Sequence, residues 1–233
     1  MRVRHSGIAA AIIAAFTTAT AASAQIVVGT GTDGNCIPFT CNLSVGSFYQ
    51  EIYAAGAFTG SGFITEIDFF RNQTGMLNTM SFTLSLSTTT KGLNVNGIGG
   101  ISTTTPNAND GADNTLFGTY SIGGAAPAIL SFLGTPYFYD PSAGNLLLDL
   151  RVTSLTPAPS GTLAFYNANS GDAANLSRAD DFSSAGFTGY GLVTQFNLDQ
   201  KGQGLSVITP EPATLGLLAT GFAGLVGFRR RRR

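Results

Sequence analysis

Two carboxylates separated by one residue are the first candidates for chemistry in this sequence. Glu66 and Asp68 lie in the run 63–71, whose composition predicts a strand, and residues i and i+2 of a strand share one face. Their side chains would then lie about 7 Å apart, near the separation that an inverting glycosidase needs between its acid and its base. Such enzymes place the two carboxylates on opposite sides of a cleft, however. The pair therefore indicates an exposed strand face, with a carboxylate-dependent glycan hydrolase as the less favoured alternative.

An oxygen-rich loop at residues 107–114 is the second candidate. Its sequence is Asn-Ala-Asn-Asp-Gly-Ala-Asp-Asn, and calcium prefers carboxylate and amide oxygens as ligands. The spacing fails the EF-hand pattern, because Pro106 and Ala108 stand where acidic ligands are needed. Turns built on Asn, Asp and Gly are the simpler explanation. We assign no metal site and no cofactor, and a structural calcium ion in this loop stays an open alternative.

The histidine and cysteine content excludes several reaction classes. The chain has one histidine, His5, so residues 25–208 contain none. This excludes Ser-His-Asp and Cys-His catalysis and nearly every zinc site in that region. Cys36 and Cys41 are an even pair, and in an exported chain they predict a disulfide. A redox pair is the alternative, but its usual spacing is Cys-x-x-Cys. The sequence therefore predicts no catalytic residue.

Aromatic and threonine residues suggest two binding hypotheses. Tyr137, Tyr139 and Tyr166 could stack on sugar rings if they lie on the surface. The absence of tryptophan weakens this hypothesis, and packing into a core explains the tyrosines equally well. The threonine triplets at 88–90 and 103–105 lack the regular repeat over many strands that a flat ice-binding face needs. Ice binding is therefore not predicted.

The net charge of the chain conceals an uneven distribution. The chain has 12 Lys plus Arg and 13 Asp plus Glu, which gives a formal net charge of -1. Seven of the basic residues lie near the two ends, so residues 25–208 hold five basic residues against twelve acidic ones. A nucleic-acid-binding protein needs a basic surface. The acidic central region therefore excludes nucleic acid as a partner.

The region 25–208 has the pattern of short strands that would position these residues. Alternating or apolar runs are separated by Gly, Asn, Asp, Ser and Pro. In one run, Phe82, Leu84 and Leu86 would face inward, as in a half-buried antiparallel strand. In another, strict alternation would place Phe63 on the same face as Ile67. Eight runs are expected to be strands: 47–58, 63–71, 79–89, 116–122, 128–133, 146–154, 162–167 and 190–198.

Eight short strands predict an all-β fold, an antiparallel β-sandwich of jelly-roll-like type. The only helix candidate in the region is 173–182, and its pattern is weak. Two loops are long, at 91–114 and 167–189, and binding sites on such folds often lie in loops. Residues 91–109 are equally compatible with a disordered linker.

The N-terminal residues predict a secretory signal peptide. Two arginines stand near the start, residues 8–16 form a short apolar stretch, and Ala22 and Ala24 supply the small side chains of a cleavage site. Cleavage after Ala24 would remove residues 1–24. Before its removal, this segment would direct the protein into an export pathway of the Sec type.

The C-terminal residues contain three features in order. Pro210, Glu211 and Pro212 precede an uncharged segment, 213–228, which is followed by a cluster of arginines. A helix of this length would span about 24 Å, which is less than the hydrocarbon core of about 30 Å in a typical bilayer. It would therefore be a marginal transmembrane helix. The arginines would stay in the cytoplasm and act as a stop-transfer signal: Arg229, Arg230, Arg231, Arg232 and Arg233.

In this order, the features of residues 209–233 resemble the PEP-CTERM sorting signal of Gram-negative bacteria, a tail also labelled an ice-binding-protein C-terminal motif. The resemblance implies recognition by an exosortase, a membrane cysteine protease-transpeptidase that removes the tail at or near Pro210, Glu211 and Pro212. It also implies a transient stay in the inner membrane, followed by delivery to the cell surface or extracellular matrix. A plain C-terminal membrane anchor is the alternative.

The expected organisation is a signal peptide at 1–24, an extracytoplasmic β-sandwich at 25–208 and a sorting signal at 209–233. The middle of the chain, from 116 to 150, also looks like the ectodomains often found ahead of this tail, which are secreted β domains without an assigned activity. We therefore expect a non-enzymatic surface or matrix protein with a structural or adhesive role in the envelope or biofilm. A carbohydrate-binding module for exopolysaccharide is the alternative.

Overall fold

The computed structural model describes residues 23–31, 33–169, 175–182 and 190–199. The chain divides into two compact units, Met1–Gln200 and Lys201–Arg233, and every described residue belongs to the first unit. Within the described ranges the regular elements are strands and two short 3-10 turns. No helix in these ranges is long and apolar enough to cross a membrane. The sorting signal and most of the predicted signal peptide lie outside the described residues.

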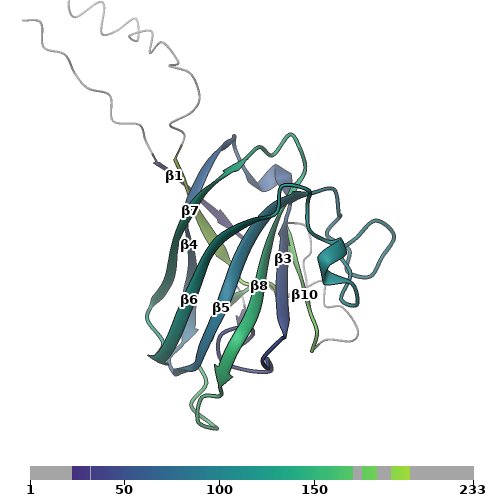
Figure 1. Ribbon diagram of the computed structural model, residues 1–233. Helices are drawn as coiled ribbons and strands as arrows, with labels where there is room; N and C mark the ends of the chain where they lie inside the picture. Colours follow the sequence, from purple (N-terminus) through teal and green to yellow (C-terminus); the bar gives the residue numbers. More distant parts are fainter. Residues whose placement is uncertain (1–22, 32, 170–174, 183–189, 200–233) are drawn as a thin grey trace, which may run out of the picture. The chain divides into compact units, whose positions relative to one another are not determined.

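The described strands form two antiparallel sheets, which confirms the all-β prediction (Figure 1). The five-stranded sheet has the order β10-β3-β8-β5-β6. The six-stranded sheet has the order β1-β11-β4-β9-β2, and β7 pairs with β4 as well. The strands are β1 (Ser23–Val28), β2 (Asp33–Asn35), β3 (Phe48–Tyr53), β4 (Gly62–Gln73), β5 (Met76–Thr89), β6 (Thr115–Ala125), β7 (Ile129–Tyr139), β8 (Asn145–Thr156), β9 (Phe165–Ala168), β10 (Leu176–Asp180) and β11 (Thr194–Asp199); the 3-10 turns are η1 (Ala55–Ala57) and η2 (Pro106–Ala108).

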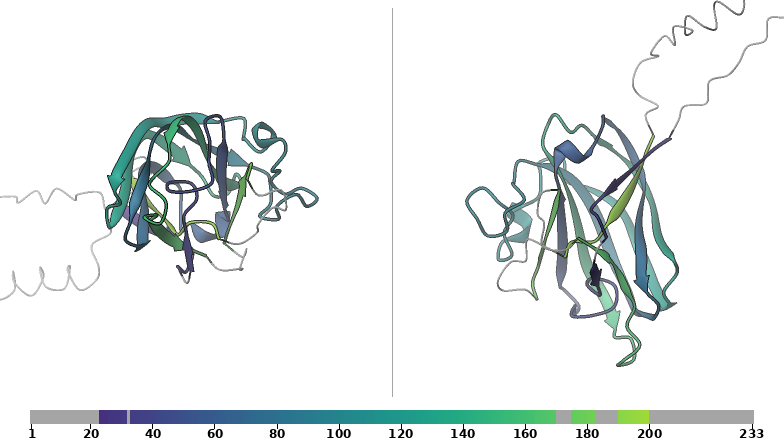
Figure 2. Two further views of the ribbon diagram at one scale, coloured as in Figure 1. Left: turned by 90° about the horizontal axis from the view of Figure 1, so that it is seen from below. Right: turned by 180° about the vertical axis from the view of Figure 1, so that it is seen from behind.

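The two sheets face each other across one hydrophobic core. Figure 1 shows the five-stranded sheet in front, and the views in Figure 2 show the second layer behind it. Phe39, from the segment between β2 and β3, lies at the centre of this core and is 1% exposed. Its ring contacts four others, from both sheets: Phe69, Phe82, Phe132 and Tyr166. Aromatic contacts of this kind add to the stabilisation from burial.

Alternation along β5 confirms one predicted strand face. Phe82, Leu84 and Leu86 are fully buried in the core, whereas Ser81 and Thr83 are partly exposed on the other face. β5 lies between β8 and β6 and pairs with both. A long strand with one apolar face can therefore occupy the middle of a sheet whose other face is polar.

A β-bulge in β4 overturns a second predicted face. The register of β4 against β11 shifts at this point: Ile64 pairs with Leu198 and Glu66 with Asn197, so β4 has one residue more than β11. An extra residue at a bulge reverses the alternation of the strand. Ile64 and Ile67 are consequently both buried in the core, whereas Phe63 is partly exposed and packs against Phe138. Grouping Phe63 with Ile67 was wrong because strict alternation does not continue through a bulge.

The predicted helix at 173–182 is also wrong over the residues that the structure describes there. Leu176–Asp180 form β10, which pairs antiparallel with β3. Every residue of β10 is buried. Pairing with the open edge of β3 satisfies the backbone and overrides a weak local helix preference.

Candidate functional site

The segment between β5 and β6 packs on the outer face of the five-stranded sheet. The hydroxyl of Thr89 donates to the carbonyl of Asn109 at 2.8 Å, and the N–H of Gly111 donates to the Ser87 hydroxyl at 3.0 Å. Ile101 is fully buried in a second hydrophobic cluster with residues of β3, β8 and β10: Phe48, Ile52, Leu147 and Ala179. A disordered linker at 91–109 is therefore the wrong alternative, because this segment has its own buried anchor.

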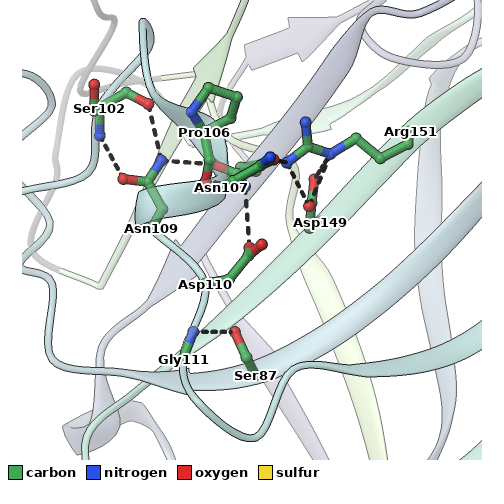
Figure 3. Close-up of polar contacts among 10 residues, drawn as sticks. Ser87, Ser102, Pro106, Asn107, Asn109, Asp110, Gly111, Asp149 and Arg151 are labelled. Carbon is green, nitrogen blue, oxygen red and sulfur yellow. Dashed lines mark hydrogen bonds and ion pairs between the residues drawn. The ribbon is translucent and has the colours of Figure 1, made fainter.

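Asn109 holds this segment to the sheet through its side chain (Figure 3). Its Nδ2 donates to Gln50 Oε1 at 2.7 Å and to the carbonyl of Ser102 at 2.8 Å. Its Oδ1 accepts a hydrogen bond from the N–H of Ser102 at 2.8 Å. Asn109 is 0% exposed, and its bond to Gln50 is buried, so the loss of that bond would leave a buried polar group unpaired.

A charged patch lies where this segment meets β8. The Nε of Arg151 donates to both carboxylate oxygens of Asp149, each at 2.8 Å, and its Nη2 donates to Asn107 Oδ1 at 3.0 Å. The guanidinium also lies 5.4 Å from the ring centre of Phe48. Figure 3 shows the guanidinium of Arg151 next to both Asn107 and Asp149. Arg151 is thus positioned by an ion pair, an amide and an aromatic face.

Asp110 completes the patch as a second carboxyl group. Its Oδ1 accepts a long hydrogen bond of 3.4 Å from Gln50 Nε2. Partial burial and the charge of Asp149 raise the pKa of Asp110 to about 6, although Arg151 opposes the shift. Burial also raises the pKa of Asp149 against the effect of Arg151. The patch can therefore exchange a proton near pH 6 and form hydrogen bonds with a polar ligand, but its guanidinium is already engaged.

The loop at residues 107–114, for which calcium binding was the open alternative, uses its side-chain oxygens within the protein. Oxygens of Asn107, Asn109 and Asp110 accept the bonds described above. Asp113 accepts from the N–H of Thr88 at 2.8 Å and from the Tyr137 hydroxyl at 2.7 Å. These oxygens therefore already accept hydrogen bonds from donors of the protein itself. Over the described ranges, no group of three or more His, Cys, Asp or Glu side chains could hold a metal ion.

A second group of polar side chains lies between the sheets, at Glu51 of β3. The hydroxyls of Tyr49 and Tyr53 and the N–H of Leu192 all donate to its carboxyl group. Glu51 is 0% exposed. Burial raises its pKa to about 6, although the bonds from the two tyrosines and Leu192 oppose the shift. Burial also raises the pKa of both tyrosines well above the ordinary value.

The neighbouring strand adds a buried ion pair to this group. Arg178 of β10 stands opposite Glu51 in the strand register, and its Nη1 lies 3.6 Å from Asp180. The positive charge of Arg178 acts to lower the pKa of Glu51. Glu51 and its phenol partners are thus enclosed in the domain, with no exposed surface. Sequence reasoning missed this group, although Tyr49, Glu51 and Tyr53 at two-residue spacing indicate one shared strand face.

The three tyrosines that could stack on sugars if they lay on the surface lie inside the domain. Tyr137 is 5% exposed, Tyr139 0% and Tyr166 1%. The hydroxyl of Tyr139 donates to the carbonyl of Gly144 at 2.8 Å. The surface position was wrong because strand alternation directs all three rings inward. A carbohydrate-binding function cannot use them as a platform.

The structure brings Glu66 and Asp68 together on the outer face of β4, but this face is not fully exposed. Asp68 is 5% exposed, and Glu66 is partly buried. Both accept hydrogen bonds from Asn197 of β11. The expected exposed face is therefore wrong for Asp68, because the side chains of the neighbouring strand cover it.

The remaining predicted residues lie at the ends of the domain or beyond it. Cys36 and Cys41 form a disulfide, with a Cα–Cα distance of 5.4 Å. Ala24 lies in β1 opposite Leu198, so the predicted cleavage site falls inside the first strand. Ala22 and the predicted sorting residues of 210–212 and 229–233 lie outside the described residues.

Comparison with known proteins identifies one segment of the chain. Residues 209–232 match the family model of the PEP-CTERM protein-sorting motif. No curated protein and no solved structure gives a significant match. The match covers the C-terminal segment and leaves the β domain without a characterised relative in these comparisons.

Proposed function

We propose that this chain is an exosortase substrate displayed at the bacterial surface. It carries a PEP-CTERM protein-sorting motif at residues 209–232. At the surface, its β domain has a structural or adhesive role. The motif carries the proposal, because it implies export and membrane-associated surface display. The expected signal peptide at 1–24 and apolar segment at 213–228 agree with this route. We assign the route to a Gram-negative envelope, with the extracellular matrix or biofilm as the destination.

The chemistry of the β domain supports a role without catalysis. Residues 25–208 contain no histidine. The carboxyl group of Glu51, whose pKa is about 6, is enclosed in the core. Asp110 has a similar pKa, but the neighbouring Arg151 is bound to Asp149. A jelly-roll-like β-sandwich, supported by two antiparallel sheets around one core, would serve as a compact surface module.

Replacement of Pro210, Glu211 and Pro212 by alanine tests the sorting route. In cells that contain an exosortase, we expect the wild-type chain to be shortened and released, whereas the variant should remain a full-length precursor in the membrane fraction. The reason is that these three residues form the recognition motif. Immunoblots of membrane and medium fractions measure both outcomes.

The chain offers a matched control for this experiment. Thr156-Pro157-Ala158-Pro159 has the same Thr-Pro-x-Pro pattern but lies in the β domain, at the end of β8 and in the loop that follows. Replacement of Pro157 and Pro159 by alanine should leave processing unchanged. Normal shortening and release of the variant altered at residues 210–212 would refute the proposed route.

A further inference from the structure

Four polar side chains converge on the outer face of the six-stranded sheet. Glu66 and Asp68 come from β4, and Gln195 and Asn197 come from β11; we call these four residues the acid–amide cluster. The strand register places Gln195 opposite Asp68 and Asn197 opposite Glu66. The cluster therefore joins two neighbouring strands that are far apart in the sequence.

A single atom shows how closely the two carboxylates approach. The Nδ2 of Asn197 lies 2.7 Å from Glu66 Oε2 and 3.1 Å from Asp68 Oδ2. The Nε2 of Gln195 lies 3.0 Å from the same oxygen of Asp68. Oxygens of both carboxylates are thus within hydrogen-bond distance of the same atom, the amide nitrogen of Asn197.

The negative charge of the cluster is not balanced within the described part of the chain. Asp68 is 5% exposed, and its Oδ1 is buried without a hydrogen-bond partner. The salt bridges found in the described ranges join Arg151 to Asp149 and Arg178 to Asp180, and neither includes Glu66 or Asp68. A buried carboxylate is costly unless a counter-charge and hydrogen bonds compensate it. The unpaired Oδ1 therefore points to a missing positive partner.

The donor atoms indicate what kind of partner this is. The cluster contains carboxylate and amide groups and no nitrogen or sulfur ligand, which favours a hard cation. Rotation of the Asn197 or Gln195 amide by half a turn would exchange its NH₂ group for its oxygen. Calcium accepts six to eight oxygens in flexible geometry, whereas magnesium requires a near-ideal octahedron. Glu66 and Gln195 are partly exposed, so water can reach the site and supply further ligands.

We propose that the acid–amide cluster is a binding site for a divalent cation of the calcium class. Glu66 and Asp68 would be its charged ligands, and Asn197 and Gln195 would provide amide oxygens. The bound ion would link β4 to β11, the last described strand before the sorting motif. This inference does not depend on the proposed sorting route, since it concerns the folded β domain alone.

Calcium binding to the full chain in detergent micelles tests the site. We expect equilibrium dialysis with radioactive calcium to show one saturable ion per chain in the micromolar-to-millimolar range that is typical of extracellular calcium modules. Calcium should also raise the unfolding temperature measured by circular dichroism, and a chelator should reverse the rise. Asp68→Asn and Glu66→Gln should each weaken binding about tenfold or more, because each removes a charged ligand.

Asp140→Asn is the matched control, because Asp140 is a carboxylate in the turn between β7 and β8, outside the cluster. It should bind calcium like the wild type. No saturable binding by the wild-type chain, or equal binding by the wild type and both cluster variants, would refute the site. If Asp68→Asn fails to fold, Glu66→Gln and the chelator-reversible shift of the wild type still decide the question.

Discussion

Glu51 combines two opposing influences on one carboxyl group. Burial between the sheets favours its protonated form, whereas donors from Tyr49, Tyr53 and Leu192 favour the carboxylate. Burial is the larger effect, so the pKa is raised to about 6. A buried polar group whose partners are all present favours one arrangement of the strand that carries it. At the residue scale, the inner face of β3 therefore contains a group whose protonation affects stability.

The raised pKa makes the stability of the domain depend on pH. The contribution of Glu51 is fully present below its unfolded-state pKa of about 4.5 and is lost as pH rises through about 6. The substitution Glu51→Gln removes the ionisable group. From pH 4.5 to pH 7, the free energy of unfolding of this variant should therefore fall by about 1–2 kcal/mol less than that of the wild type. Urea unfolding at both pH values measures the difference. Asp110 and Asp149 also have raised pKa values, so some pH dependence should remain.

Asp181→Asn is the control for removal of one negative charge, since Asp181 is exposed just after β10. It should keep the pH dependence of the wild type. The assignment to Glu51 would be wrong if Glu51→Gln showed the same change between the two pH values as the wild type.

At the element scale, the segment between β5 and β6 is an ordered part of the domain. Connections longer than about 12–15 residues are usually functional or disordered, and this one runs from residue 90 to residue 114. It is held by the buried side chains of Ile101 and Asn109. Beneath it, Ser87 and Thr89 are buried, although they occupy the polar face of β5. The segment therefore positions Asp110 beside Asp149 and Arg151.

Asn109→Ala should detach this segment. The substitution removes three side-chain hydrogen bonds and deprives Gln50 Oε1 and the backbone N–H and carbonyl of Ser102 of these partners. Unpaired buried groups cost about 1–3 kcal/mol each, so we expect a loss of about 2–4 kcal/mol and new protease cleavage between residues 91 and 114. Thermal unfolding and limited proteolysis with mass spectrometry measure these effects.

Asn107→Ala provides the comparison within the same segment. Asn107 is exposed and bonds through its side chain to Arg151. Its replacement should change the free energy of unfolding by less than about 1 kcal/mol and should leave the protease pattern unchanged. Equal effects of the two substitutions would contradict the anchoring role of Asn109.

At the scale of the whole β domain, the first and last described strands are neighbours. β1 and β11 pair antiparallel, with Ser23 opposite Asp199. β11 also pairs with β4, so it is an inner strand of its sheet. Phe196 and Leu198 of β11 are 0% exposed. The predicted signal cleavage site after Ala24 and the last described residue, Asp199, therefore lie at the same end of the β1–β11 pair.

This arrangement predicts that the domain survives removal of the tail. A chain that ends at Gln200 should keep the unfolding temperature of the full chain, because β11 and its pairing remain intact. A chain that ends at Val193 lacks β11 and should not fold, because an inner strand and its buried side chains are missing. Circular dichroism melting curves compare the two truncations with the full chain. A large loss of stability in the chain that ends at Gln200 would contradict this prediction.

Most long strands could be predicted from the sequence, whereas the short strands β2 and β10 could not. β5 and β8 contain long runs of apolar residues at strand spacing, so their existence follows from local pattern. β2 has three residues and β10 five, and neither has an alternation long enough to detect. These short strands form because a neighbouring strand offers backbone partners. The bulge in β4 was missed for the same reason, because pairing with β11 determines its position.

The candidate sites were predictable only in part. Glu66 and Asp68 are recognisable as a pair because they are two residues apart on one strand. Their partner Asn197 is 131 residues from Glu66, and no local pattern connects them. Asp110 and Asp149 likewise come together only because the segment between β5 and β6 packs against β8. The burial of Asp68 and the raised pKa of Asp110 follow from these distant contacts.

The sequence by itself determined the features that depend on contiguous residues. The PEP-CTERM motif, the absence of histidine from residues 25–208 and the strand alternation are all local. Only the tertiary structure decided which carboxyl groups are enclosed, which are paired and which lack a partner. The physical reason is that burial and charge compensation depend on neighbours that the two sheets bring together from distant parts of the chain.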